Sequence, residues 1–211
     1  MLDVHAPHER IHGFRDFLLH LLTITIGLLI ALGLEGCVEW SHHRHLRDEA
    51  DANIRKELRD NRKEVAATVA AVAQERQELT LVLNLFVART KGERPDIHQF
   101  SLNYVLGTLS NASWRTASAT GALSYMEYAH VQSYATAYEI QDQFSSLQAA
   151  TLNDFLQLQA YVVGNFDPTK VSVADAQAAS ADARRALSHI FAMEQFGSQL
   201  QATYAKALAP D

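Results

Sequence analysis

The stretch that decides the fold is residues 17–38, "FLLHLLTITIGLLIALGLEGCV". From Phe17 to Leu34 this run contains no Asp, Glu, Lys or Arg. About 20 helical residues cross roughly 30 Å of hydrocarbon, and a run this uniformly apolar has no face for water. The stretch predicts a transmembrane helix over residues 17–40, preceded by a tail over residues 1–16. A buried core helix is the first alternative.

A cleaved signal peptide is the second alternative. The tetrapeptide "LEGC" that ends at Cys37 looks like the lipobox of bacterial lipoproteins, in which the cysteine becomes the lipidated first residue of the mature chain. Glu35 fits poorly, because that box takes small uncharged residues. We therefore expect an uncut chain that continues through the cysteine.

The predicted span carries a row of small residues. Thr23, Gly27 and Ala31 recur every four residues, which puts them on one helical face. Such a face lets a second transmembrane helix approach closely. The alternative is that glycine and alanine are simply common in membrane helices.

The end of the span has the composition of a membrane interface. An indole such as that of Trp40 sits well between headgroups and hydrocarbon, and Glu35 can reach toward water. His42 and His43 follow, and amphipathic, titratable imidazoles suit a headgroup region. These four residues are the predicted interfacial set.

Beyond the span, no proline or glycine occurs between Trp40 and Arg89, so we expect the helix to continue as a stalk. Asn61, Thr68 and Glu75 occupy alternate positions of its seam, which makes the seam imperfect. Apolar residues at heptad-like spacing predict a coiled-coil or bundle face: Ile54, Leu58, Val65, Val72, Leu79, Val82 and Phe86.

The remaining chain reads as helices separated by breaks. Gly92 and Pro95 end the stalk, and residues 97–126 predict a short helix, a polar corner and a restart near Thr120 or Gly121. Further helices are expected over about 123–163 and from Ser172 to about 208, the last opened by Ser172 with Asp175 as an imperfect capping box. Their predicted buried sides are Ile140, Phe144, Leu147, Thr151, Phe155, Leu158 and Val162, and Ala183, Leu187, Ile190, Met193, Leu200 and Tyr204.

The fold class predicted from these patterns is all-α. No strand-like alternation is present. One N-terminal transmembrane helix would continue into a long stalk helix, and residues 41–211 would form an extramembrane antiparallel helical bundle.

Three stretches carry a resemblance to a known family: "TITIGLLIALGLEG" (23–36), "WSHHRHLRDEADANIRKELRDNR" (40–62) and "ASWRTASATGALSYMEYAHVQSYATAYEIQ" (112–141). Together they resemble a family of uncharacterised bacterial proteins anchored by a single membrane helix. In that family a charged helix leads to a corner of the type Trp-x-x-Ala-x-x-x-Gly-Ala-Leu. The matching positions here are Trp114, Ala117, Gly121, Ala122 and Leu123.

This resemblance implies the layout and a location in a bacterial inner membrane, and it implies no activity. As a packing device the corner makes physical sense. We expect the indole of Trp114 to wedge where the chain reverses, and Gly121 to let two backbones approach.

The charge balance excludes a nucleic-acid partner. The net charge of −6 comes from 18 basic and 24 acidic residues, which leaves no basic surplus for phosphates. No phosphate-binding loop, zincin motif or nucleophile elbow is present, and Cys37 has no base beside it in sequence. We predict a protein that is not an enzyme and has no cofactor.

Histidines offer a metal-binding alternative. His5, His8 and His12 lie in the tail, and His42, His43 and His45 lie at the membrane exit. A metal needs ligands that converge on one point, yet a span would put these two groups on opposite sides of the membrane.

A di-iron alternative comes from Glu-x-x-His, which occurs as Glu39 with His42 and as Glu127 with His130. Paired copies on two helices build di-iron sites in four-helix bundles. The expected register places these two copies far apart. We therefore predict no metal site.

Two function classes remain. The first is an interaction subunit in the lipid bilayer, either a homo-oligomer or a protein attached to other membrane-protein subunits. The second is a ligand-sensing bundle that signals through a partner. An apolar cavity inside the bundle would favour the sensor, and a large apolar stalk face left for another chain would favour the subunit.

The side of the membrane that the bundle occupies stays open. The positive-inside rule favours a cytoplasmic bundle, whereas a short tail ahead of an anchor usually stays inside and favours the reverse. The basic residues compared are Arg10 and Arg15 before the span, and Arg44, Arg47, Arg55, Lys56 and Arg59 after it.

Overall fold

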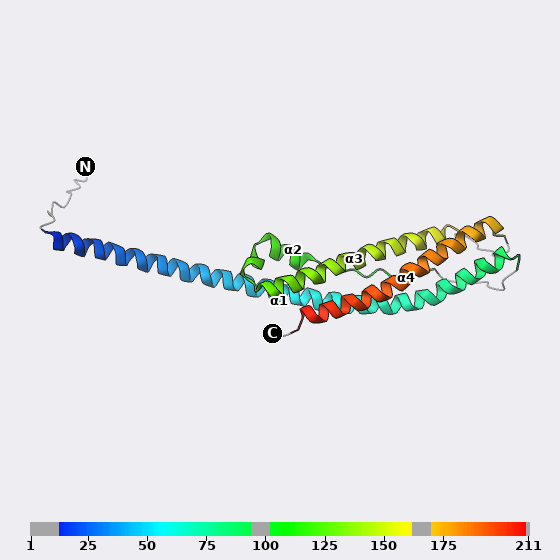
Figure 1. The fold of residues 1–211 in the computed structure, drawn as a ribbon, viewed down its shortest axis with the longest axis horizontal. Coiled ribbons are helices and arrows are strands. Elements are labelled where there is room, and N and C mark those ends of the chain that lie inside the picture. Colours follow the sequence, from blue (N-terminus) through cyan, green and yellow to red (C-terminus); the bar gives the residue numbers. More distant parts are fainter. Residues whose placement is uncertain (1–12, 94–101, 162–169, 210–211) are drawn as a thin grey trace, which may run out of the picture. The chain divides into compact units, whose positions relative to one another are not determined.

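A computed structural model describes residues 13–93, 102–161 and 170–209, and all regular structure in these ranges is helical. The elements, drawn in Figure 1, are α1 (Phe14–Thr90), α2 (Ala112–Ala119), the 3-10 helix η1 (Ala122–Tyr125), α3 (Tyr128–Gln159) and α4 (Val173–Ala207). The predicted all-α fold is confirmed. The chain divides into two compact units, Met1–Asp48 and Glu49–Asp211, and the division falls inside α1.

The first unit contains one candidate membrane-spanning helix. The most apolar window of α1 has a mean hydropathy of 2.4, and none of it is buried. Length and composition define the candidate, and a signal sequence or a soluble core helix meets the same two criteria.

The second unit is built on α1, α3 and α4. Side-chain contacts pair Asp51 with Tyr134 and Asn61 with Gln141, so this part of α1 runs parallel to α3. By contrast, Arg55 bonds the carbonyl of Leu208, close to the last turn of α4, so α4 is antiparallel to α1. Figure 1 shows the same directions. The two parallel helices are possible because the connection between them returns along the bundle.

The heptad row predicted for α1 is its buried face. All seven apolar residues of that row, from Ile54 to Phe86, are at most 1% exposed. Each such side chain contributes about 1.5–3 kcal/mol on burial. Asn61, Thr68 and Glu75 are buried in the same row, at 4%, 2% and 6% exposure. The polar positions are therefore as much a part of the core as the apolar ones.

Residues 102–111, here called the strap, connect the two parallel helices. This segment has no helix, although the sequence predicted a short one in this region. Side chains of α1 and α3, at Glu75 and Gln148, bond its main-chain groups at Val105 and Gly107. These distant side chains satisfy main-chain groups of the strap, so the strap does not form the local hydrogen bonds of a helical turn.

Helix α3 begins at Tyr128, later than the predicted start near Leu123. Gly121 has a φ of 75°, and Met126 is extended, so no single helix can pass through both. Of the predicted stripe, Phe144, Thr151, Phe155 and Leu158 are buried, Ile140 and Leu147 are half-buried, and Val162 lies outside the described residues.

Helix α4 matches its prediction closely. The hydroxyl of Ser172 accepts a hydrogen bond from the Asp175 N–H at 3.0 Å and donates one to the Asp175 carboxylate at 2.7 Å. This is the expected cap. Leu187 is half-buried, and the other predicted core residues of this helix are buried: Ala183, Ile190, Met193, Leu200 and Tyr204.

Candidate functional site

The small-residue row of the first unit is an open surface. Thr23, Gly27 and Ala31 are all exposed. The Thr23 hydroxyl donates to the Leu19 carbonyl at 2.9 Å, so it is satisfied within its own helix, as hydrocarbon requires. A Cβ built on Gly27 would meet nothing within 4 Å. This row therefore has room for another helix.

The predicted interfacial residues also lie on the first unit. Glu35, Trp40 and His42 are exposed, and His43 is half-buried. The Arg44 guanidinium carbon lies 5.4 Å from the centroid of the Trp40 ring, a cation–π distance. A charged and an aromatic side chain thus share this part of α1.

The predicted corner is a packed unit around Trp114. Its ring stacks on Tyr138 of α3, with centroids 5.4 Å apart and planes inclined by 24°. Ala117 is buried and Leu123 is half-buried. The role predicted for Gly121 was wrong, because a Cβ there would meet nothing within 4 Å. Its φ of 75° is the reason for glycine at this turn.

The buried polar residues of α1 and α3 bind the main chain of the strap. The side-chain amide of Asn61 donates to the Ser110 carbonyl at 2.7 Å and accepts from the Ser110 N–H at 2.9 Å. Gln141 donates to the same carbonyl at 3.0 Å and accepts from the Tyr204 hydroxyl at 2.6 Å. One polar chain thus joins α1, α3, α4 and the strap.

A second amide repeats this pattern further along the strap. Gln148 accepts from the Gly107 N–H at 3.0 Å and donates to the Gly107 carbonyl at 3.2 Å. The backbone there lies so close to α1 that a Cβ on Gly107 would stand 2.2 Å from the Thr68 hydroxyl oxygen. Only glycine fits this place without a shift.

Three glutamates of α1 also bond this connection, and one of them, Glu64, accepts from the Thr108 N–H at 3.3 Å. Glu57 accepts from the Tyr138 hydroxyl at 2.6 Å, the Ser110 hydroxyl at 2.7 Å and the Ser113 N–H at 3.0 Å. Glu75 accepts from the Val105 N–H at 2.7 Å through Oε1. Its other oxygen, Oε2, is buried and has no hydrogen-bond partner among the described residues.

The carboxyl groups of Glu57 and Glu75 differ in acidity. Burial raises the pKa of Glu57, but the hydrogen bonds from Ser113, Tyr138 and Ser110 together outweigh it and lower that pKa below its ordinary value. For Glu75, burial raises the pKa, and the single bond from the Val105 N–H only partly opposes it. The nearby charge of Glu78 raises it further.

Sequence reasoning found the seam positions of α1 but missed their partners. Asn61, Thr68 and Glu75 were read as flaws in a coiled-coil seam. The missed residues, Gln141 and Gln148, are seven apart on α3, the same interval that separates the α1 set. Two polar rows of equal spacing were the signal for a segment held between two helices.

A further charged cluster joins α3 to α4. Asp154 is 3% exposed, accepts from Arg185 Nε at 2.8 Å and lies 2.6 Å from His189 Nδ1. Arg185 also bonds Asp182 at 3.0 Å. The buried carboxylate is therefore fully paired, as a buried charge must be.

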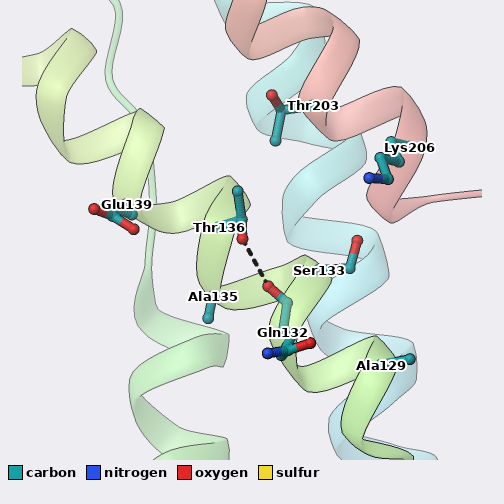
Figure 2. Close-up of a pocket in the computed structure, with 8 residues that line it drawn as sticks. All are labelled: Ala129, Gln132, Ser133, Ala135, Thr136, Glu139, Thr203 and Lys206. Atoms are coloured by element: carbon teal, nitrogen blue, oxygen red, sulfur yellow. Dashed lines mark hydrogen bonds between the residues drawn. The ribbon is translucent and has the colours of Figure 1, made fainter.

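An open groove of about 600 Å³ lies between α3 and α4. Figure 2 shows the side chains that line it. Thr136 donates to the Gln132 carbonyl at 2.9 Å on its wall. The lining residues are small or polar: Ala129, Gln132, Ser133, Ala135, Thr136, Glu139, Thr203 and Lys206.

No metal-binding group was found in the described ranges. No three or more His, Cys, Asp or Glu side chains there could hold an ion together. His5, His8 and His12 lie outside the described residues. Cys37 is a free, exposed thiol.

Comparison with models of protein families, with curated proteins and with solved structures found no match. What the fold and these contacts define is a helical bundle with one candidate membrane-spanning helix. The resemblance to a bacterial membrane-anchored family stays a prediction.

Proposed function

We propose that this protein is a non-enzymatic, single-pass protein of a bacterial inner membrane and acts there as an interaction subunit. The observation that carries the proposal is the exposed apolar helix, whose most apolar window has no buried part in the described chain. An apolar surface of this length needs cover, and a bilayer about 30 Å thick supplies it. The lipid bilayer is the first partner.

The second unit supports association through the span and not along the stalk. Its heptad row, from Ile54 to Phe86, is at most 1% exposed because its own chain covers it. A coiled coil with another chain would need that row. Self-association, or attachment to other membrane-protein subunits, is therefore proposed at Thr23, Gly27 and Ala31.

A ligand-sensing bundle that signals through a partner is the second candidate. The observation behind it is the groove between α3 and α4, where a small molecule would lie against small and polar side chains; it is open, and not the apolar internal cavity that a sensor would favour. A metal-binding role has no support from the described residues.

Native mass spectrometry of the full chain, taken from its own membranes in mild detergent, tests the proposal. We expect a defined homo-oligomer or a complex with other polypeptides. In the homo-oligomer Gly27→Leu should leave monomers, because a leucine side chain keeps the helices apart. A wild-type monomer that carries a small bound mass would overturn the subunit proposal and favour the sensor.

Gly36→Leu is the matched control. It is the same substitution in the same apolar segment, and a Cβ at Gly36 also meets nothing within 4 Å. At 3.6 residues per turn, Gly36 lies about two and a half turns beyond Gly27, on the opposite side of the helix. Loss of the oligomer in both variants would contradict a specific face.

A further inference from the structure

We propose that Glu75 makes the middle of the strap a pH-sensitive latch. When its buried carboxyl ionises, residues 104–106 leave α1, while the contacts at Gly107 and Ser110 remain. The latch is a property of the bundle and does not depend on the proposed function.

The geometry around Glu75 disfavours an ionised carboxylate. The residue is 6% exposed, one oxygen has a single donor in the Val105 N–H, and the other has none in the part of the chain that the structure describes. An ionised carboxylate has room for about four hydrogen bonds. A buried charge with one donor is costly unless a cation pairs with it.

The neighbouring charged groups do not provide that cation. On α1, Glu78 has the same charge, and Arg76 is directed to Glu194 of α4, with a nitrogen–oxygen distance of 3.5 Å. On the strap, the Tyr104 hydroxyl lies within hydrogen-bond distance of the Met193 sulfur and the Gln148 carbonyl, and burial raises its pKa. Tyr104 is therefore neutral and engaged elsewhere.

Helix α3 adds no free charge at this level. Its buried Gln148 and Thr151 are uncharged. Its acidic group, Asp154, is paired with Arg185 and His189 of α4. Neither helix therefore compensates an ionised Glu75.

Lifting the strap relieves the buried charge. Once residues 104–106 move away, water reaches the carboxylate, and the contacts given up are the hydrogen bond at Val105 and those of the Tyr104 side chain with Gln148, Met193 and Phe155. The main chain at Gly107 and Ser110 is held by groups that do not titrate, the amides of Gln148 and Asn61. Two carboxylates also contact this part of the strap: Glu64 accepts from the Thr108 N–H, and Glu57, whose pKa is lowered, accepts from the Ser110 hydroxyl. The opening is consequently local.

The direction with pH follows from the raised pKa of Glu75. A carboxyl with a raised folded-state pKa stabilises the closed strap at low pH, where it is neutral. This stability is lost as the pH rises through the folded pKa. The strap is thus closed in acid and opens toward alkaline pH.

Amide hydrogen exchange on the full chain in lipid nanodiscs tests the latch. The protection factor, corrected for the intrinsic pH dependence of exchange, is measured at Val105 and at Ser110 over pH 4–9. For wild type we expect protection at Val105 to fall as the pH rises from the ordinary value of 4.5 to the raised folded pKa, by at most about tenfold per pH unit, the limit for one proton, and to level off above it. Protection at Ser110 should stay constant.

Glu75→Gln removes the titrating group and keeps its shape, so its Val105 protection should not change with pH. Glu57→Gln, at the other end of the connection, should keep the wild-type response. Constant protection at Val105 in wild type would overturn the proposal, and so would an unchanged fall in Glu75→Gln. An equal fall at Ser110 would do the same, because it would indicate global opening. The comparison of the two wild-type amides needs no variant to fold.

Discussion

Glu57 and Glu75 are the same residue type on the same helix, and each accepts a main-chain N–H from the connection between α1 and α3. Glu57 has three donors and lies partly exposed, whereas Glu75 has one donor and is buried. Their pKa values move in opposite directions. The number of donors around a carboxylate, and not its burial alone, decides whether it fastens a segment as an anion or as a neutral acid.

The largest loss of stability is expected when a side chain is added at Gly107, where the strap lies closest to α1. Gly107→Ala puts a Cβ 2.2 Å from the Thr68 hydroxyl oxygen and lifts the strap beside Glu75. We expect a loss of about 2–3 kcal/mol in the free energy of unfolding, typical of overpacking. Urea unfolding of the bundle, followed by circular dichroism, measures it.

Adding Thr68→Ala to Gly107→Ala removes the clashing hydroxyl oxygen. This double variant tests whether the clash causes the loss of stability. The double variant should recover most of the lost stability, since the nearest atoms left are the Cβ of residue 68 and the Gln148 side-chain oxygen, 3.3 and 3.4 Å from the new Cβ. If the double variant were as unstable as Gly107→Ala, close approach to α1 would not explain the glycine.

A smaller loss of stability is expected at Glu57, which accepts three hydrogen bonds. Glu57→Gln replaces charge-assisted hydrogen bonds from Tyr138, Ser110 and Ser113 with neutral ones, and its side-chain amide cannot accept at the nitrogen. We expect a loss of about 1–2 kcal/mol at pH 7. The pH dependence has a definite sign, because the pKa of Glu57 is lowered.

A lowered folded-state pKa stabilises the protein above the ordinary value of 4.5, and this stability is lost as the pH falls through the folded pKa. The difference between wild type and Glu57→Gln should therefore shrink in acid. Urea midpoints at pH 7 and at pH 3 check this. A difference that grew in acid would mean that Glu57 does not act as an anion.

The smallest effect, with the opposite sign, is expected at Glu75. Glu75→Gln should stabilise the bundle by about 1 kcal/mol at pH 8, because it removes a poorly solvated charge while its carbonyl still accepts from Val105. Below pH 4 the two proteins should be alike, since wild-type Glu75 is then neutral. Glu78→Gln, one turn away on the same helix, should stabilise the bundle by less, because the charge of Glu78 is only a minor cause of the raised pKa of Glu75.

Urea midpoints of wild type and Glu75→Gln, measured as a function of pH, test this prediction. A destabilised Glu75→Gln at pH 8 would show that the ionised carboxylate is satisfied in the folded state. The two glutamates would then be alike, and the contrast between the ends of the connection would disappear.

Sequence alone determined the three long helices to within a few residues at their ends, the apolar segment and the buried face of α1. Periodicity carries this information, because a helix repeats every 3.6 residues and shows which side leaves water. The row from Ile54 to Phe86 and the cap at Ser172 were predicted on that basis, and the structure has both. The candidate span is a matter of composition over one continuous stretch.

Only the tertiary structure decided what covers the polar positions of that face. Residues 102–111 form no helix, because their main-chain partners are Asn61, Glu75 and Gln148, dozens of residues away. Periodicity tells which side chains are buried but not what covers them. In the sequence Glu75 interrupts an apolar seam, whereas in the structure it accepts a hydrogen bond from the strap, and burial with a single donor, both products of the fold, raises its pKa.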